Sequence, residues 1–211
     1  DAAPASVVDD PDIVASAKSV FQVYAEHDVM TAFEGTAFPI APDRFMTAAH
    51  VVRDSDSIAV VNHKGERVPA EIVVCDPDHD VAVLAAPGVD ATVLAFGTAE
   101  ADDVAAVVGF PDDGPLTFSP ARVRQRLDWQ SSDIYGNGRY THDAYQVRGK
   151  IRGGNSGGPM FAEDGSVLGV VVAWSRADPD TGYVLTSDQV SDAVDRGTSG
   201  APGSADDCRS G

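Results

Sequence analysis

Short apolar runs, each closed by a turn sequence, recur along most of the chain and restrict its fold more than any other feature. Examples are RFMTAAHVV, SIAVVNH, AEIVVC, DVAVLAA, VAAVVGF and VLGVVVAW. The stretches between them, such as HKGE, DPD and FPDDGP, are rich in the Gly, Pro, Asp and Asn residues that form turns. Many short strands at this spacing are typical of an all-β sandwich or a pair of barrels. We therefore predict an all-β fold.

Two segments have a helical pattern instead. DIVASAKSV has a weak one, whereas SDQVSDAVDRG has a clear one, in which Thr186 and Gln189 fit a capping box and Gly197 can end the helix. The opening DAAPASVVDDPD and the closing GTSGAPGSADDCRSG have little apolar surface to contribute to a core. We expect a linker or short helix in residues 1–18, one half in 19–110, a second half in 111–186 after a crossing at FPDDGP, and a helix and tail in 187–211.

The chain is strongly acidic, with a formal net charge of −18 and a pI near 4.3. Nucleic acid and anionic membrane surfaces would repel it at long range, so neither is expected as a partner. Its longest apolar runs are shorter than the roughly 18 residues that a membrane span needs. Because it begins at Asp1 without a signal-like segment, we expect a mature form or a domain cut from a longer protein.

The two cysteines, Cys75 and Cys208, lie far apart in the sequence. They permit one long-range disulfide but form no C-x-x-C redox or metal motif. Two separate thiols, one buried in a strand and one in a mobile tail, are an equally good reading. The residues alone leave both possibilities open.

His50 is the first candidate for a catalytic residue. The run GTAFPIAPDRFMTAAHVV predicts two apolar strands around the turn APDR and places His50 at a strand end. A histidine in such a position is by itself more often structural than catalytic. The remaining histidines lack comparable context, and we expect them on the surface or in loops: His27, His63, His79 and His142.

Asp80 is the second candidate, because it follows an acidic turn and leads directly into the apolar strand VAVL. A carboxylate at the mouth of a strand can be buried beside a histidine. The spacing of Asp76, Asp78 and Asp80 also resembles the start of a calcium loop. Such a loop requires Gly after the third acid and Glu at its twelfth position, where this chain has Val81 and Pro87. We therefore expect no metal site.

The third candidate is Ser156, in the glycine-rich stretch GGNSGGP. Glycines on both sides of a serine let the backbone turn its N–H groups toward one point, as an oxyanion hole requires. A generic glycine turn would not need this serine, and the local sequence does not exclude that alternative. However, the chain order His50, Asp80, Ser156 is the order of the chymotrypsin-like triad.

These three segments resemble the triad motifs of trypsin-like serine proteases, particularly the bacterial branch that includes the high-temperature-requirement proteases. Longer stretches, PARVRQRL, DIYG, DAYQVRGKIRGGNSGGP and TGYVLTSDQV, are similar to the mycobacterial acid-resistance periplasmic protease family (MarP). The similarity extends over nearly all of the segment from Ser19 to Val190. The resemblance implies two six-stranded antiparallel β-barrels with a C-terminal helix, with His50 and Asp80 from the first barrel and Ser156 from the second.

The resemblance also implies a serine endopeptidase that needs no cofactor. In that family pattern His50 is the general base and then acid, Asp80 orients it, and the N–H groups of Gly154 and Ser156 bind the oxyanion. Asn155 stands where digestive trypsin-like enzymes carry an aspartate that pairs with a newly cut amino terminus, which suggests that loops control the order of the hole. The alternative is a latent fold that acts as a protein-binding module until activated.

The substrate pocket is less clear from the sequence. By analogy with the family, its floor lies near Lys150 and Ile151 and one wall near Ala173, Trp174 and Ser175. Lys150 could favour an acidic side chain or simply point into solvent. No cleavage preference is predicted.

Family members are anchored to the inner membrane and process envelope proteins in acid and oxidative stress. The resemblance thus implies a periplasmic domain, cut at Asp1 from its upstream anchor, that acts as a monomer on protein or peptide substrates of the envelope. The relatives also have a cysteine shortly before the EGT segment, bridged to one near the C terminus. Cys208 matches the latter, but residues His27 to Phe33 contain no cysteine. The family's disulfide cannot form in that way, and whether Cys75 replaces the missing partner is open.

Overall fold

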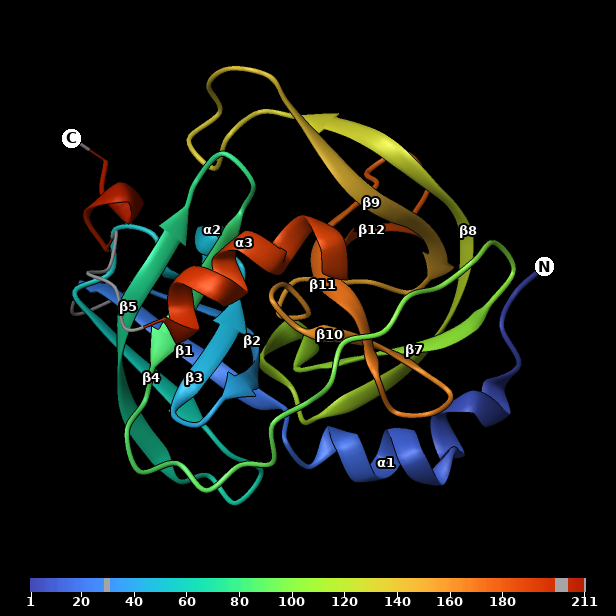
Figure 1. The fold of residues 1–211 in the computed structure, drawn as a ribbon, viewed down its shortest axis with the longest axis horizontal. Helices are drawn as coiled ribbons and strands as arrows, with labels where there is room; N and C mark the ends of the chain where they lie inside the picture. The colour runs from blue at the N-terminus through green and yellow to red at the C-terminus, as the bar shows by residue number, and fades with distance from the viewer. Residues whose placement is uncertain (29–30, 200–204, 211) are drawn as a thin grey trace.

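The computed structural model describes residues 1–28, 31–199 and 205–210. Within these residues the strands form two closed barrels in which all pairings between named strands are antiparallel (Figure 1). Twelve strands divide equally between the barrels. The predicted fold class is confirmed.

The first barrel has the strand order β1-β2-β3-β6-β5-β4. Its strands are β1 (Phe21–Asp28), β2 (Thr31–Ala41), β3 (Arg44–Thr47), β4 (Ser57–Val61), β5 (Arg67–Asp76) and β6 (Val81–Ala85), with the short helix α2 (Ala49–Val52) after β3. Large apolar side chains such as Phe38, Phe45 and Leu84 are fully buried in its core. Their burial explains why these strands are nearly continuous apolar runs in the sequence.

The second barrel has the order β10-β11-β12-β9-β8-β7. Its strands are β7 (Val104–Gly109), β8 (Thr117–Ser131), β9 (Tyr140–Gly149), β10 (Pro159–Ala162), β11 (Val167–Trp174) and β12 (Thr181–Thr186), and the 3-10 turn η2 (Pro111–Asp113) follows β7. A separate apolar cluster that includes Tyr145, Met160 and Val184 fills this barrel. The Tyr145 hydroxyl lies in that core and accepts a hydrogen bond from the Ala99 N–H at 3.0 Å.

The passage from one barrel to the other lies earlier than expected. Strand β7 precedes FPDDGP, yet it pairs with β8 and β10 of the second barrel. The connection is therefore residues 86–103, between β6 and β7, and the expected division at 110 and 111 assigns β7 to the wrong half. The reason is that FPDDGP is a turn within the second barrel, and turn residues alone do not show which strands pair across them.

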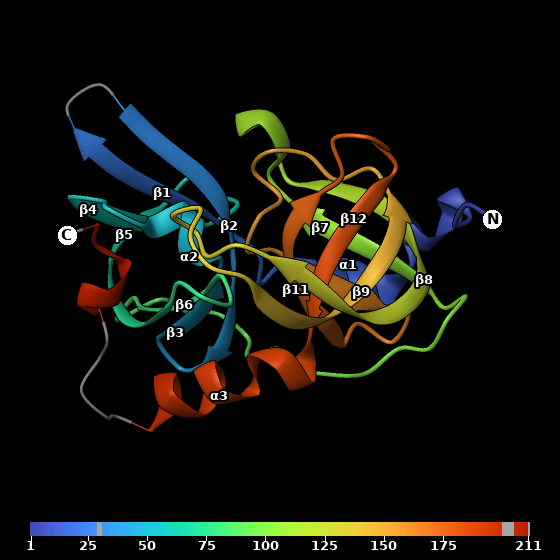
Figure 2. The ribbon, with the colours of Figure 1, turned by 90° about the horizontal axis from the view of Figure 1, so that it is seen from above.

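Helices lie outside the barrels. Apart from α2 and η2, which are given above, they are η1 (Ala5–Asp9), α1 (Pro11–Ala17), α3 (Ser187–Thr198) and η3 (Ala205–Cys208). Figure 2 shows α3 running along one side of both barrels, and its residues contact β3, β5 and β6 of the first and β9, β11 and β12 of the second. One helix therefore packs against both barrels. None of the helices in the described ranges is long and apolar enough to cross a membrane.

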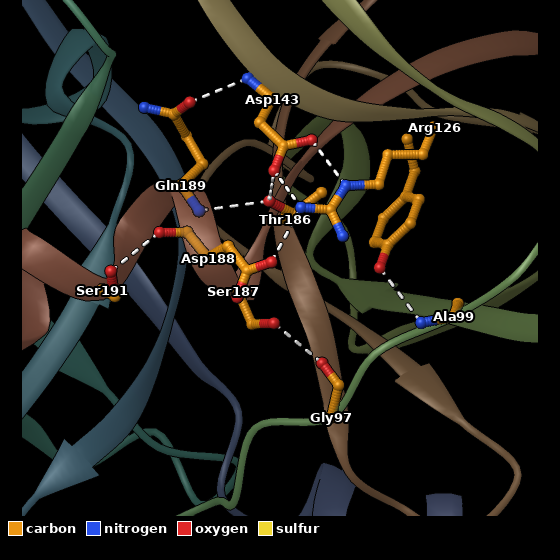
Figure 3. Close-up of polar contacts among 10 residues, drawn as sticks. Gly97, Ala99, Arg126, Asp143, Thr186, Ser187, Asp188, Gln189 and Ser191 are labelled. Carbon is orange, nitrogen blue, oxygen red and sulfur yellow. Dashed lines mark hydrogen bonds and ion pairs between the residues drawn. The ribbon is translucent and has the colours of Figure 1, made fainter.

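The start of α3 forms half of the predicted capping box. The Thr186 hydroxyl accepts a hydrogen bond from the Gln189 N–H at 3.1 Å, but the Gln189 side chain accepts from the Asp143 N–H of β9 instead of returning to Thr186. Arg126 on β8 binds the carboxylates of both Asp143 and Asp188, so the helix start is attached to the second barrel (Figure 3).

Gly197 does not end α3, which was the expectation. The helix continues to Thr198, and Gly197 is buried where a Cβ atom would lie 2.7 Å from a side-chain carbon of Val83. The glycine therefore permits close contact between the helix and β6 instead of a C-terminal cap.

Cys75 of β5 and Cys208 of η3 form a disulfide, with their Cα atoms 5.7 Å apart. Both residues are buried. Of the two readings left open by the sequence, the bridged one is correct, and Cys75 is the partner of Cys208. The bridge attaches the described part of the C-terminal segment to the first barrel.

Candidate active site

His50 and Asp80 lie in direct contact on the first barrel. The Nδ1 atom of His50, in α2, is 2.7 Å from Oδ2 of Asp80, which lies in the turn between β5 and β6. The second carboxylate oxygen, Oδ1, accepts a hydrogen bond from the His50 backbone N–H at 2.8 Å. Both oxygens of one carboxylate thus fix both the backbone and the ring of the histidine. With Nδ1 as the donor, Nε2 is left as an acceptor.

The electrostatics of this pair favour a charged imidazole. Burial acts to lower the pKa of His50, but the negative charge of Asp80 and its hydrogen bond together outweigh burial and raise the pKa above its usual value. The nearby Arg53 opposes them only in part. An imidazolium formed during a reaction would therefore be stabilised at this position.

Ser156 lies in the loop between β9 and β10 and is 4% exposed. Its carbonyl accepts a hydrogen bond from the Thr36 N–H of β2 at 2.9 Å. The next residue, Gly157, has φ +83° and packs so closely that a Cβ atom there would lie 2.6 Å from the Ala48 nitrogen. Ala48 is two residues before His50. The loop that carries Ser156 is thereby held against the segment that carries the histidine.

The backbone before Ser156 forms a tight turn from Arg152 to Asn155. The Asn155 N–H donates to the Arg152 carbonyl at 3.1 Å, and Gly154, the third residue of the turn, has φ +90°. A positive φ at this position is the signature of a type II turn. The Gly153 carbonyl accepts from the Asp112 N–H at 2.8 Å, and because C=O and N–H of one peptide unit point in opposite directions, the Gly154 N–H points away from Asp112.

The two predicted oxyanion donors are free to bind. The Asn155 carbonyl accepts from the Gly158 N–H at 2.9 Å, which turns the Ser156 N–H to the opposite side of that peptide. Neither the Gly154 nor the Ser156 N–H donates to an acceptor among the residues that the structure describes. Two unpartnered N–H groups beside one serine can bind a negatively charged oxygen.

Asn155 is 1% exposed, and its side chain belongs to the same turn. Its Oδ1 accepts a hydrogen bond from the Arg152 N–H at 3.0 Å. Its Nδ2 has no partner among the described residues. The amide therefore closes the turn from within.

The five residues predicted to shape a substrate pocket have different environments. Lys150 is exposed, whereas Ile151 is buried and its Cδ1 would lie 2.1 Å from a Cβ atom at Gly182. Ala173 is half-buried, Trp174 is 43% exposed, and the Ser175 hydroxyl accepts hydrogen bonds from Ala177 and Asp178. Ile151 thus covers Gly182 with an apolar side chain, and Lys150 has the solvent-facing position that the sequence left open.

The acidic turn does not assemble as a calcium loop. Oδ2 of Asp76 is 2.8 Å from Nδ1 of His79, while Asp80 binds His50. Within residues 1–28, 31–199 and 205–210, no group of three or more His, Cys, Asp and Glu side chains could hold a metal ion.

His142 contradicts the expectation of a surface or loop position. It lies on β9, is almost fully buried, and its Nε2 is 2.8 Å from the Ser131 hydroxyl, while its Nδ1 has no partner among the described residues. Burial lowers its pKa, so the ring is kept neutral. The signal was available, because His142 is two residues before the apolar Ala144 and therefore on the same face of the strand.

Sequence reasoning also missed Thr36. It is the second residue of the run GTAFPI, is 0% exposed, and bonds to the loop of Ser156. A hydroxyl inside such a run must find a hydrogen-bond partner, which was a usable signal.

Comparisons with known proteins agree with this geometry. Residues 35–170 match the family model described as "Trypsin-like peptidase domain". The chain is 38% identical over 190 residues to serine protease Rv3671c of Mycobacterium tuberculosis, which covers 88% of this chain and 47% of that protein. It is 29% identical over 174 residues to a probable periplasmic DegP-like serine endoprotease of Chlamydia pneumoniae, covering 78% of the chain and 34% of that protein.

Solved structures show the same similarity. The crystal structure of the active form of Rv3671c protease has a TM-score of 0.91 at 34% identity, covering 96% of this chain and 90% of that one. The inactive form has a TM-score of 0.84, covering 94% and 98%. The chain spans about half the length of the curated mycobacterial relative that it matches. The chain belongs to the trypsin-like serine peptidase family.

Proposed function

We propose that the chain is a serine endopeptidase domain that hydrolyses peptide bonds through an acyl-enzyme. The observation that carries the proposal is the pair of free N–H groups at Gly154 and Ser156, on a loop whose Gly157 packs against the segment of His50. A latent binding module predicts instead that the Gly154 N–H is turned toward an acceptor inside the protein, and the absence of such an acceptor among the described residues supports the peptidase.

The mechanism follows from the roles of these groups. Nε2 of His50 takes the proton of the Ser156 hydroxyl as its oxygen attacks the substrate carbonyl, while Asp80 holds the ring and stabilises the imidazolium. The Gly154 and Ser156 N–H groups bind the resulting oxyanion. His50 then donates its proton to the leaving amine, which departs as the acyl-enzyme forms. Water then attacks the ester carbonyl while His50 takes one of its protons, and the bond to the Ser156 oxygen breaks as His50 returns that proton to it, which releases the carboxylic acid and restores the enzyme.

The test is labelling with a fluorophosphonate probe. We expect the probe to label Ser156, as located by peptide mass analysis, and the protein to cleave fluorescent casein. A Ser156→Ala variant should lose both signals while keeping its thermal unfolding temperature. Casein cleavage that persists in Ser156→Ala would refute the proposal.

We propose further that the domain works outside the cytoplasm as a monomer, tethered upstream to the inner membrane, and processes envelope proteins in acid or oxidative stress. The names of the DegP-like relatives and the buried disulfide support an extracytoplasmic site, because disulfides persist in oxidising compartments. Fusion of the full-length protein to a reporter active only in the periplasm tests the location. Gel filtration tests the monomer, and survival of a Ser156→Ala strain in acid tests the stress role.

Within this proposal, the pocket is lined by the floor and wall residues expected from the sequence. Buried Ile151 over Gly182 supports an apolar floor, and exposed Lys150 does not contribute a charge to it. Cleavage-site mapping on casein, before and after Lys150→Gln, tests this arrangement. The same sites should be cut by both proteins.

A further inference from the structure

Thr36 is a buried polar residue that belongs to neither the catalytic pair nor the nucleophile loop. It lies on β2 of the first barrel, between Gly35 and Ala37, and is 0% exposed. Because a buried hydroxyl without hydrogen-bond partners destabilises the folded protein, we expect the Thr36 hydroxyl to have partners, and these indicate what the residue does.

Thr36 makes its polar contacts with the second barrel through backbone groups of two segments, the loop that carries Ser156 and the segment after β7 that begins at Phe110. The Thr36 hydroxyl donates to the Gly154 carbonyl at 2.7 Å and accepts from the Phe110 N–H at 3.2 Å. The Thr36 N–H donates to the Ser156 carbonyl at 2.9 Å. One residue of the first barrel thus binds the nucleophile loop of the second barrel at two carbonyls.

These bonds hold both peptide units that meet at Gly154. The unit between Gly154 and Asn155 is fixed at its carbonyl by the Thr36 hydroxyl. The unit between Gly153 and Gly154, whose N–H is the predicted oxyanion donor, is fixed at its carbonyl by the Asp112 N–H at 2.8 Å. Asp112 is two residues beyond Phe110, which binds the same Thr36 hydroxyl. The hydroxyl therefore holds one unit directly and the other through the segment 110–112.

We propose that Thr36 is a positioning residue whose hydroxyl keeps the turn before Ser156 in the conformation that aims the Gly154 N–H at the oxyanion. This inference rests on the proposed peptidase function. Types I and II of such a turn differ mainly by rotation of its central peptide, here the one that carries the Gly154 N–H. Without the hydroxyl, the partly buried Gly154 carbonyl loses its donor, and the turn can rearrange to recover one.

The test compares two substitutions at Thr36 with one matched control. Thr36→Val keeps the shape and removes the hydroxyl, whereas Thr36→Ser keeps the hydroxyl. Thr186→Val is the control, because Thr186 is also buried and its hydroxyl also makes two hydrogen bonds, to Asp143 and Gln189, away from the turn. Rates are measured on a fluorogenic peptide chosen from mapped casein cleavage sites, with thermal unfolding in parallel.

We expect Thr36→Val to lower kcat about tenfold to a hundredfold with KM within threefold of the native value, since one oxyanion donor is worth about 10²–10³ in rate. Binding of a peptide boronate, which forms a tetrahedral adduct, should weaken by the same factor. Thr36→Ser should stay within threefold of native, and Thr186→Val should lose stability but keep its kcat. If Thr36→Val does not fold, Thr36→Ala replaces it, because Ala and Ser differ only by the hydroxyl.

A native kcat in Thr36→Val would overturn the inference, and so would an equal loss in Thr36→Ser, which would assign the effect to packing of the methyl group. Failure of the peptidase proposal is distinct from either result. In that case the native protein itself would neither label at Ser156 nor cleave casein.

Discussion

Two adjacent glycines, Gly153 and Gly154, should respond in opposite ways to alanine. At Gly154 the backbone has φ +90°, and a Cβ atom would lie 2.1 Å from the Phe110 carbonyl oxygen. At Gly153 φ lies outside the positive region and nothing is within 4 Å of the Cβ position. Alanine at position 154 is therefore disfavoured both by the backbone conformation and by a clash with a backbone atom, whereas alanine at position 153 meets neither obstacle.

The cost at Gly154 can be estimated from these two effects. A left-handed backbone costs an L-residue about 1–2 kcal/mol, and a contact at 2.1 Å with a carbonyl oxygen cannot be relieved by moving a side chain. The turn must therefore change its conformation, which moves the Gly154 N–H away from the oxyanion. Loss of one such donor costs about 2.7–4 kcal/mol, so kcat should fall at least a hundredfold.

Gly153→Ala should stay within threefold of native kcat and gain about 0.4–1 kcal/mol in stability, because alanine restricts the unfolded chain. The assay is single-turnover hydrolysis of a fluorogenic peptide, with chemical denaturation of each variant. A Gly154→Ala enzyme that keeps native kcat would refute the assigned turn. Equal losses at both positions would also refute it, because they would show that the turn needs glycine for flexibility alone.

The remaining predictions concern the disulfide, the pH profile and the attachment of α3. Replacing Cys75 and Cys208 by Ala should lower the free energy of unfolding by up to about 5 kcal/mol, which is the chain-entropy value for a bridge between residues 133 positions apart. A loss below about 1 kcal/mol in denaturant titrations would contradict this prediction. Because Asp80 raises the pKa of His50, we expect kcat/KM to rise with pH through a midpoint above about 6.5, and a kcat/KM profile already flat at about pH 6 would contradict this expectation. The stability that the charged His50–Asp80 pair contributes is complete below about pH 6.5 and is lost as the pH rises through the pKa of His50 in the folded protein. Arg126→Met removes an exposed guanidinium that bridges two carboxylates and should cost about 1 kcal/mol in stability without changing kcat, whereas a loss of kcat would show that α3 is coupled to the site.

What the sequence could predict depended on how local each signal was. The all-β fold, the helix α3 and the segments of His50, Asp80 and Ser156 follow from runs and motifs that are contiguous in the chain, whereas the two six-stranded barrels were implied by the family resemblance. The direct contact of His50 with Asp80 was expected from the family pattern, and the structure places these two side chains 2.7 Å apart.

Pairings between distant segments were harder to predict. Nothing near β7 indicates that it joins β10 and β8 in the second barrel, and nothing near Cys75 indicates that it lies beside Cys208. Gly197 fits a helix end by sequence, but its actual role depends on Val83 in another element. These features are set by which surfaces pack together, which a local pattern does not encode.

The turn from Arg152 to Asn155 is held both by the neutral side chain of Asn155 and by contacts with residues far away in the sequence. Asn155 closes the turn from within, because its Oδ1 accepts a hydrogen bond from the Arg152 N–H. Thr36 and Asp112 hold it from outside, Thr36 through its hydroxyl and Asp112 through its backbone N–H. The only ion pair beside the turn, among the residues that the structure describes, joins Arg152 to Asp112 at 3.2 Å, and both side chains are exposed, so it contributes little. Because the groups that hold the turn do not titrate, acid should act on the site through His50 and leave the shape of the oxyanion hole unchanged.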